Sequence, residues 1–329
     1  MSRGVTLGMG EVERAGGREL VDAPFGNALA ALARRRDDIV GLTADLAKYT
    51  DILPFKEACP SRFFNVGMAE QNLVAVAAGL AKSGFVAYCT TYGVFATRRA
   101  YDFIAIACAH SRAEVKIFAG LPGLTTGYGG THQAIEDLAL MRMVPDLVVI
   151  DPCDATELEQ VTHAVAAHRG PAYVRLLRGA VPRVLDPETH RFAIGRSYVL
   201  REGRDIGLVS TGLMTERALD AAEILSAAGI SAGVLHVPTI KPFDAAGVAA
   251  FARRHDRLIS IENHVVSGGL GALLAEALFE AGIVKPLERV GIPDRFIECG
   301  SLPFLQEQCG MTVPQIVALA NDKTKRRTP

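Results

Sequence analysis

The chain has 329 residues, of which 49% are hydrophobic, and its 35 basic and 36 acidic residues leave a formal net charge of -1. This length allows two domains with separate cores, and the balanced charge gives no electrostatic reason to expect nucleic acid or an anionic membrane as a partner. The first 17 residues lack the apolar stretch of a secretory signal, and no apolar segment is long enough to span a membrane, so we expect a cytoplasmic protein.

From residue 23 onward, short apolar runs alternate with longer segments of helical periodicity. Strands are predicted at residues 39–42, 85–90, 115–119, 147–150 and 173–177. Helices are predicted at residues 24–35, 69–82, 96–110, 133–143 and 155–167, with Asp154 as the N-cap of the last one. This alternation is typical of an α/β fold in which helices cover both faces of a mostly parallel sheet.

The alternation lapses between residues 179 and 197, where two prolines and several polar residues suit a connection between domains. A second alternating unit follows, with strands at 206–210, 232–237 and 258–261, helices at 216–228, 245–255 and 271–281, and a last helix at 314–320. We therefore expect a flexible segment 1–17, a first domain 18–180, a linker 181–200 and a second α/β domain 201–329, ending in a frayed basic tail at 323–327.

The six cysteines are scattered along the chain and form no Cys-x-x-Cys pair. Most of them lie within apolar segments, which is typical of reduced thiols in a hydrophobic core. We therefore predict no metal site in this chain.

A single carboxylate, Glu70, stands where a short apolar strand turns into the helix predicted at 69–82. The segment reads Arg62-Phe-Phe-Asn-Val-Gly-Met-Ala-Glu70-Gln-Asn72. Taken alone, a Glu at this position is also typical of a residue that compensates the helix dipole. The surrounding motifs are needed to choose between that role and a catalytic one.

Seven segments carry a comparison with a known family. In the first domain they are Ala44-Asp45-Leu46-Ala47-Lys48 with the segment around Glu70; Thr91-Tyr92-Gly93-Val94-Phe95-Ala96-Thr97-Arg98-Arg99-Ala100-Tyr101-Asp102; Gly127-Tyr128-Gly129-Gly130-Thr131-His132-Gln133; and Tyr173-Val174-Arg175-Leu176-Leu177-Arg178-Gly179. In the second domain they are Thr239-Ile240-Lys241-Pro242-Phe243-Asp244, Glu262-Asn263-His264 with Gly268-Gly269-Leu270-Gly271, and Gly291-Ile292-Pro293-Asp294. Together, over residues 22–322, they resemble the transketolase family, in particular the separately encoded C-terminal section of two-subunit transketolases.

The resemblance implies thiamine diphosphate as the cofactor and Glu70 as the catalytic acid. A carboxyl group bonded to the pyrimidine ring nitrogen favours the tautomer in which the cofactor's own amine acts as a base. A helix N-terminus favours the ionised carboxylate, whereas burial favours the neutral acid, and the sequence leaves this choice open. Tyr92 and Phe95 match the aromatic positions of the pyrimidine pocket, with Phe95 as the stacking residue, although both are also typical of an ordinary core. Asp45 and Arg98 match positions near the cofactor. The alternative for Arg98 is an ordinary exposed residue of a helix that does not face the site.

Three further motifs imply contacts with the substrate. His132 ends a run of glycines, where the backbone can approach a ligand closely, and we expect it to bind a sugar hydroxyl or carry a proton. Arg178, and less surely Arg175, lies at the end of the strand predicted at 173–177, at the sheet edge where α/β proteins bind ligands, and a guanidinium there suits a phosphate or sulfonate. Lys48 matches a position near the acidic end of the substrate. The alternatives are that His132 has only a structural role and that Arg178 is solvated or ion-paired.

The sequence contains no acidic Gly-Asp-Gly followed by a downstream Asn, the element that holds a magnesium diphosphate in thiamine enzymes. The resemblance therefore implies a separate N-terminal subunit that carries the diphosphate-binding domain and holds Mg²⁺ or Ca²⁺. Two copies of each chain are expected, because family active sites lie between opposing protomers. This chain alone is expected to be inactive.

The segment from Gly127 to His132 departs from the family pattern. It is one residue shorter than the Gly-Glu-Asp-Gly-Pro-Thr-His of transketolases that act on common sugar phosphates, and it lacks the Asp that recognises a sugar hydroxyl. Lys48-Tyr49-Thr50-Asp51 also replaces the usual Lys-Ser-Thr. The expected reaction is therefore the transfer of a two-carbon ketol unit from an unusual acidic ketose to an aldose. A beta subunit of a 2-oxoacid dehydrogenase, a 1-deoxy-xylulose-5-phosphate synthase and a non-catalytic scaffold are the alternatives.

Overall fold

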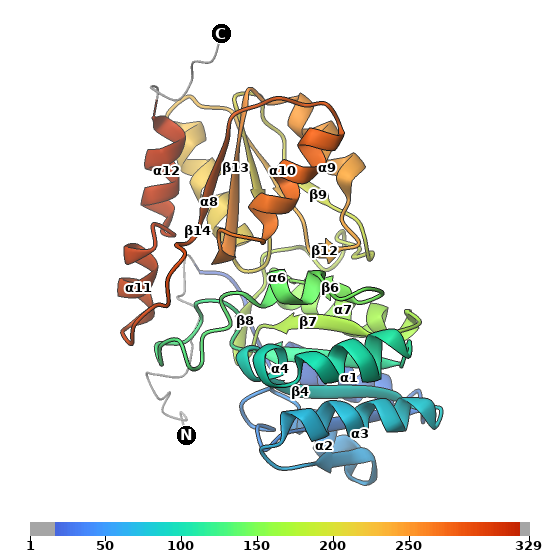
Figure 1. Cartoon of the computed structure of the whole chain (residues 1–329). Helices are drawn as coiled ribbons and strands as arrows, with labels where there is room; N and C mark the ends of the chain where they lie inside the picture. The colour runs from blue at the N-terminus through green and yellow to red at the C-terminus, as the bar shows by residue number, and fades with distance from the viewer. Residues whose placement is uncertain (1–16, 323–329) are drawn as a thin grey trace.

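The computed structural model describes residues 17–322, which form two α/β halves lying one above the other (Figure 1). This confirms the fold class predicted from the alternation of strands and helices. The basic tail at 323–327, and all of the predicted flexible segment except Gly17, lie outside the described residues. Among the described helices, none is both long enough and apolar enough to cross a membrane.

The first sheet has seven strands, and one of them comes from the second half of the chain. In spatial order they are β3 (Phe63–Asn65), β2 (Ile39–Thr43), β4 (Val86–Tyr92), β5 (Val115–Gly120), β7 (Ala172–Leu176), β6 (Val148–Ile150) and β12 (Thr239–Lys241). Strands β2, β4, β5, β6 and β7 are buried along their whole length, because helices cover both faces of a parallel sheet. β12 pairs antiparallel with β6, so the second half of the chain completes the first sheet.

Helices cover the first sheet on both sides. α1 (Pro24–Ala33) and α7 (Ala155–Ala167) contact each other on one face, whereas α3 (Glu70–Lys82), α4 (Gly93–Arg99) and the π-helix η2 (Ile104–His110) cover the other. The shorter helices are α2 (Leu53–Ala58), η1 (Pro60–Arg62), α5 (Tyr101–Phe103) and α6 (Asp137–Arg142). α7 has the predicted bounds, and the Asp154 side chain caps it by accepting from Glu157 N at 2.8 Å, as predicted.

Two predicted helices differ from those observed. The helix predicted at 96–110 begins earlier, at Gly93, and is interrupted at Ala100, beyond which the chain continues through α5 into the wider π turns of η2. The helix predicted at 133–143 is reduced to α6. Gln133 is buried and its side chain donates to the Thr126 carbonyl at 3.0 Å, which holds the start of the predicted helix in a loop.

The second sheet has five strands, in the order β14 (Leu287–Ile292), β13 (Arg257–Val265), β10 (Ile206–Ser210), β11 (Ala232–His236) and β9 (Tyr198–Arg201). Only the edge strand β9 is antiparallel to its neighbour among these described pairs. The helices are α8 (Met214–Ala227), α9 (Ala245–Arg253), α10 (Leu270–Glu280), α11 (Leu302–Gln308) and α12 (Val313–Asn321), of which α8 contacts α12 and α9 contacts α10.

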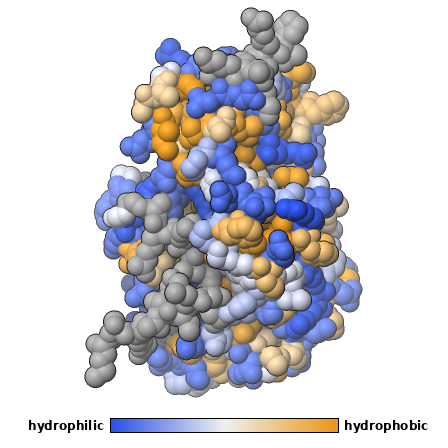
Figure 2. All heavy atoms as spheres, turned by 90° about the vertical axis from the view of Figure 1, so that its left-hand side faces the viewer, coloured by the Kyte–Doolittle hydropathy of each residue, from blue (hydrophilic) through white to orange (hydrophobic). Residues whose placement is uncertain are grey.

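The proposed linker at 181–200 contains short strands that the sequence did not indicate. β8 (Ala180–Pro182) pairs antiparallel with β1 (Leu20–Asp22), and β9 begins at Tyr198. We retain the division at 181–200 as a proposal. Figure 2 shows the side of the molecule on which α11 lies, and its hydrophobic residues gather mainly on the half formed by the second sheet and near the middle.

Candidate functional site

Glu70 is the first residue of α3 and is almost fully buried. Its side chain is 4% exposed, and Arg99 of α4 approaches both carboxylate oxygens, at 3.3 and 3.2 Å. The turn that leads to it is held by Asn65, whose side chain accepts from Asp45 N at 2.9 Å and from Gly67 N at 3.2 Å. These contacts fix the route from β3 into α3, so Glu70 enters the site from a rigid turn.

Tyr92 and Phe95 lie at the junction of β4 and α4. Their ring centroids are 5.8 Å apart with the rings tilted by 40°, and Tyr92 is only 6% exposed. The guanidinium of Arg99 lies 4.0 Å from the centroid of the Phe95 ring, so one arginine contacts both the ring and the Glu70 carboxylate. Arg99 is not among the residues predicted from the sequence, although its i+4 spacing from Phe95 places the two on one helix face.

His132 lies among aromatic rings. Its ring centroid is 5.4 Å from that of Phe95, 6.3 Å from that of Tyr92 and 5.5 Å from that of Tyr128. Its Nδ1 lies 2.9 Å from the Thr131 hydroxyl. The structure therefore brings His132 together with Tyr92 and Phe95, and it adds Tyr128 to this group.

Arg98 has different contacts from Arg99. It is ion-paired with Glu136 at 2.5 and 2.9 Å, and it donates to the carbonyls of Gly130 at 2.7 Å and Gln133 at 3.3 Å. The structure therefore places Arg98 against the loop that carries His132 rather than against the Glu70 carboxylate.

Arg175 and Arg178, near the end of β7, also have different surroundings. Arg175 is 1% exposed and its guanidinium is ion-paired with Asp137 at 2.5 Å and Asp151 at 3.2 Å, so the structure places it in a buried polar network instead of at an open site. Arg178 is half-buried and lies near Tyr92: burial raises the pKa of the Tyr92 phenol, and the charge of Arg178 opposes this. Of the two, Arg178 is the one near the aromatic group.

The remaining sequence candidates lie at the edge of the site. Asp45 is exposed, has a left-handed backbone with φ of 61°, and accepts from the Asn65 side chain at 2.9 Å. Lys48 is exposed, with its ammonium 5.9 Å from the Tyr49 ring centroid. Asp45 therefore supports the turn before Glu70, and Lys48 places an exposed positive charge near the Tyr49 ring.

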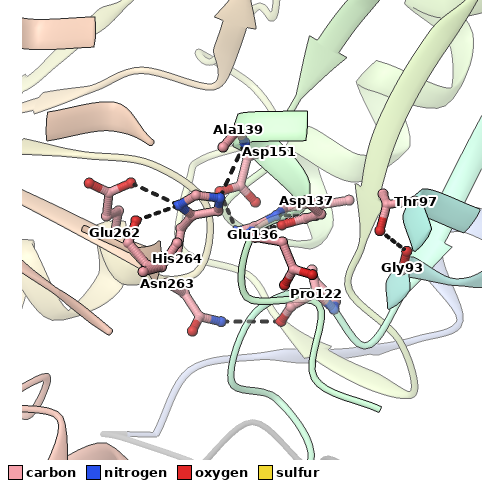
Figure 3. A network of polar contacts seen from close by, with 12 residues as sticks. Gly93, Thr97, Pro122, Glu136, Asp137, Ala139, Asp151, Glu262, Asn263 and His264 are labelled. Atoms are coloured by element: carbon pink, nitrogen blue, oxygen red, sulfur yellow. Dashed lines mark hydrogen bonds and ion pairs between the residues drawn. The ribbon is translucent and has the colours of Figure 1, made fainter. Parts of the chain in front are cut away.

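Asn263 and His264 of the second half of the chain contact the first half on either side of the segment that carries His132 (Figure 3). Asn263 accepts from Leu124 N at 2.8 Å and donates to the Pro122 carbonyl at 3.3 Å, and His264 Nε2 accepts from Ala139 N at 3.2 Å. His264 therefore bonds across the two halves of the chain. Glu262, in contrast, accepts from Leu270 N and Gly271 N, at 2.7 and 2.9 Å, and so bonds the first turn of α10 within its own half of the chain.

The arrangement suits a flat, nitrogen-containing aromatic ligand. A buried carboxylate can bond a ring nitrogen, and the partly buried Phe95 offers an aromatic ring for stacking beside Tyr92 and His132. These residues fit the aminopyrimidine ring of thiamine diphosphate. A group with the spacing of metal ligands, Cys153, Glu157 and His236, is buried elsewhere and is bonded internally, with His236 Nε2 at 2.7 Å from Glu157.

Both halves of the chain match known protein families. The chain matches the pyrimidine binding domain of transketolase over residues 21–183 and the C-terminal domain of transketolase over residues 195–316. A transketolase family protein of Sinorhizobium fredii is 54% identical, over 90% of this chain and 86% of that protein. A 6-deoxy-6-sulfo-D-fructose transketolase subunit of a Clostridium species is 40% identical, over 91% of this chain and 92% of that protein.

Among solved structures, a split-gene transketolase described as an inactive β4 tetramer has a TM-score of 0.86 and 40% identity, over 94% of this chain and 100% of that one. The chain also matches 1-deoxy-D-xylulose-5-phosphate synthases, such as that of Heliobacterium modesticaldum at 35% identity, and it spans 48% of that enzyme.

Proposed function

The chain belongs to the transketolase family, and from this we propose that it is the pyrimidine-binding and C-terminal subunit of a split, thiamine diphosphate-dependent transketolase. The observation that carries the proposal is the buried Glu70 carboxylate at the start of α3, which is linked through Arg99 to the Phe95 ring, and Phe95 in turn lies against His132. A helix-capping Glu needs none of these neighbours.

A separate partner subunit is part of the proposal. A structural relative that this chain covers over its whole length is described as a split-gene transketolase whose β4 tetramer is inactive, which supports the need for a second chain. That partner supplies the diphosphate-binding domain and holds the diphosphate through Mg²⁺ or Ca²⁺. We propose two copies of each chain, because transketolase sites form between opposing protomers.

When bound, thiamine diphosphate supplies the carbon nucleophile for breaking a carbon–carbon bond next to a ketone. Glu70 holds a proton at the pyrimidine ring nitrogen, and Phe95 and Tyr92 orient the ring. His132 binds a hydroxyl of the sugar and moves its proton, since a histidine exchanges protons near neutral pH. Arg178 binds the acidic end of the donor.

The donor class follows from the charges around the site. The Asp by which transketolases of common sugar phosphates recognise a hydroxyl is absent here, and Tyr128 stands in the same loop. The basic groups Arg178 and Lys48 favour an anionic donor. One relative is named for 6-deoxy-6-sulfo-D-fructose, so a sulfonated ketose is a donor to test beside ketose phosphates.

The test of the mechanism is Glu70→Gln in the pair reconstituted with a partner chain that carries the diphosphate-binding domain. Because the amide cannot take the place of the acid at the ring nitrogen, we expect ketol transfer to fall by at least about a hundredfold, within the range of general acid–base contributions. Glu223→Gln, on the exposed side of α8, is the matched control and should keep full activity. Size-exclusion chromatography should show unchanged assembly for both variants, and a fully active Glu70→Gln pair would disprove the mechanism.

A donor panel separates the proposed reaction from its closest competitor. This competitor is the reaction of a 1-deoxy-D-xylulose-5-phosphate synthase, which the similarity to those enzymes favours as a second candidate function. The reconstituted pair is offered a ketose phosphate, a sulfonated ketose and a 2-oxoacid, each with an aldose acceptor. Product from either ketose supports the transketolase, whereas reaction with the 2-oxoacid alone replaces it.

A further inference from the structure

The loop that carries Tyr128 and His132 rests on the second domain. Gly300 N donates to the Gly127 carbonyl at 3.1 Å, and Tyr128 forms an isolated antiparallel bridge with Cys299. Both partners belong to the segment Phe296–Gly300, which connects β14 to α11. Figure 1 shows this contact as the green loop that leaves the first sheet and lies beside the red segment before α11.

The contact explains why the loop is rich in glycine. A Cβ atom on Gly127 would lie 2.2 Å from the Gly300 carbonyl oxygen, one on Gly129 would lie 2.9 Å from the Cys299 sulfur, and one on Gly130 would lie 3.1 Å from the Phe296 ring. A distance below 3.0 Å requires neighbouring atoms to shift, and at Gly127 the atom that would be met belongs to the backbone. We attributed this run of glycines to close approach of a ligand, but in the structure it allows close approach of the second domain.

The loop is held from the opposite side by α4. Arg98 donates to the carbonyls of Gly130 and Gln133 and is ion-paired with Glu136, so it binds the loop at three points. The Phe296 ring lies 5.7 Å from the Arg98 guanidinium and completes the enclosure. The loop is therefore clamped between α4 and the segment Phe296–Gly300.

The anchoring of that segment is uneven. Ile297 is 6% exposed and belongs to the hydrophobic core, whereas Phe296 is 75% exposed. Removing the Phe296 side chain should therefore cost little core packing, because most of the ring is in contact with solvent and not with other side chains. The Phe296 ring therefore contributes mainly through its contacts with Gly130 and Arg98.

We propose that the segment Phe296–Gly300 of the second domain is a positioning element of the active site, which fixes His132 and Tyr128 against the substrate. This goes beyond the proposed function, in which the second domain has no part, and it rests on that function for its kinetic consequences. We call the contacts that hold the loop between α4 and the segment Phe296–Gly300 the clamp. The clamp holds the loop that carries His132, and we expect its loss to leave the positions of Glu70 and Phe95 unchanged. Its loss should therefore weaken use of the sugar donor while the cofactor still binds.

The first test compares Phe296→Ala with Phe279→Ala, a ring that is 87% exposed on α10 and away from the loop. Hydrogen–deuterium exchange of the isolated full chain should rise across residues 124–136 for Phe296→Ala and remain unchanged for Phe279→Ala. In the reconstituted pair, the donor KM should rise and kcat/KM should fall on the order of tenfold, because small misplacements of substrate-positioning groups are costly. The Kd for thiamine diphosphate should change less than about twofold, as judged by titration calorimetry.

The second test uses glycines. Gly127→Ala should produce the same exchange and kinetic changes, because its Cβ meets the Gly300 carbonyl, whereas Gly79→Ala adds a Cβ to open space on α3 and should change neither. Unchanged exchange in both Phe296→Ala and Gly127→Ala would overturn the clamp. Increased exchange with an unchanged donor KM would overturn its role in positioning. If the pair transfers no ketol unit at all, the proposed function fails while exchange still decides on the clamp.

Discussion

Arg98 and Arg99 are neighbours in the sequence but serve different parts of the site. Arg99 contacts Glu70 and the Phe95 ring, while Arg98 holds the loop that carries His132. Residues three and four positions after Phe95 both lie near its face of α4, so the helix pattern alone does not separate them. A buried carboxylate needs a partner of opposite charge, and the position of Glu70 selects Arg99.

Arg99→Ala should lower both stability and activity. The Glu70 side chain is 4% exposed, so losing its ion pair leaves a buried carboxylate uncompensated; because Arg99 is 50% exposed, we reduce the expected cost to about 1–2 kcal/mol. Urea unfolding measures the loss. Arg112→Ala is the control, since its ion pair with Asp146 is 78% and 59% exposed and should contribute less than about 1 kcal/mol. Equal losses in the two variants would contradict this role of Arg99.

Asp154 joins the N-terminus of α7 to the chain that follows β8. Its carboxylate accepts from Glu157 N at 2.8 Å, from Val184 N at 2.7 Å and from Leu185 N at 2.6 Å. The first bond is the N-cap that the sequence predicted. The other two fasten the chain beyond β8 to the helix, so the cap also fixes where the proposed linker begins.

Asp154→Ala should destabilise the protein by about 2–4 kcal/mol. The lost cap costs about 1 kcal/mol, and two further buried N–H groups lose their acceptor at about 1 kcal/mol or more each. Thermal or urea unfolding provides the measurement. Asp37→Ala, an exposed carboxylate in the turn before β2, should stay within about 0.5 kcal/mol of the wild type. A loss of only the cap energy in Asp154→Ala would show that the other two bonds are replaced.

The two halves of the molecule are joined by buried polar contacts in addition to β12. His264 accepts from Ala139 N, and Glu157 receives a bond from His236 of the second domain at 2.7 Å. Burial alone would raise the pKa of Glu157, but His236, His190 and the Cys153 N–H bring it to about 2. Burial and the nearby Arg175 lower the pKa of His264 to about 4, so this side chain is neutral in the folded protein.

His264→Gln should make the protein less sensitive to acid. The pKa of His264 is about 4 when folded and 6.5 when unfolded, so the unfolded chain binds the extra proton between these values and stability falls as the pH drops from 6.5 to 4. The difference corresponds to about 3 kcal/mol. A glutamine can keep one acceptor and one donor without titrating. Urea unfolding at both pH values should show the smaller fall in the variant, with the exposed His110→Gln behaving as the wild type.

Glu262 makes the stability of the protein change with pH in the direction opposite to that of His264. Burial raises its pKa from 4.5 to about 7, so the folded state binds the extra proton and its contribution to stability is lost as the pH rises through 7. Removing the titration of His264 should therefore leave a clearer decline in stability between pH 4.5 and 7. An unchanged difference between wild type and His264→Gln across this range would contradict the assignment.

Several parts of the fold could be predicted from the sequence because they depend on local pattern. The bounds of α7 and β10 and the cap at Asp154 agree with the sequence prediction, since periodicity and capping residues act within a few positions. β1, β8 and β12 were missed because each is three residues long and pairs with a remote strand. A short strand has too few residues to show a period.

Glu70 at a strand-to-helix turn, the alternation of strands and helices, and the family to which the chain belongs follow from the sequence alone, because each is written in neighbouring residues. Tertiary structure alone decided that Arg175 is buried between Asp137 and Asp151, that Arg99 rather than Arg98 meets Glu70, and that the second domain supports the His132 loop. Charge pairing and close contact depend on distances between elements far apart in the chain, and local patterns do not encode those distances.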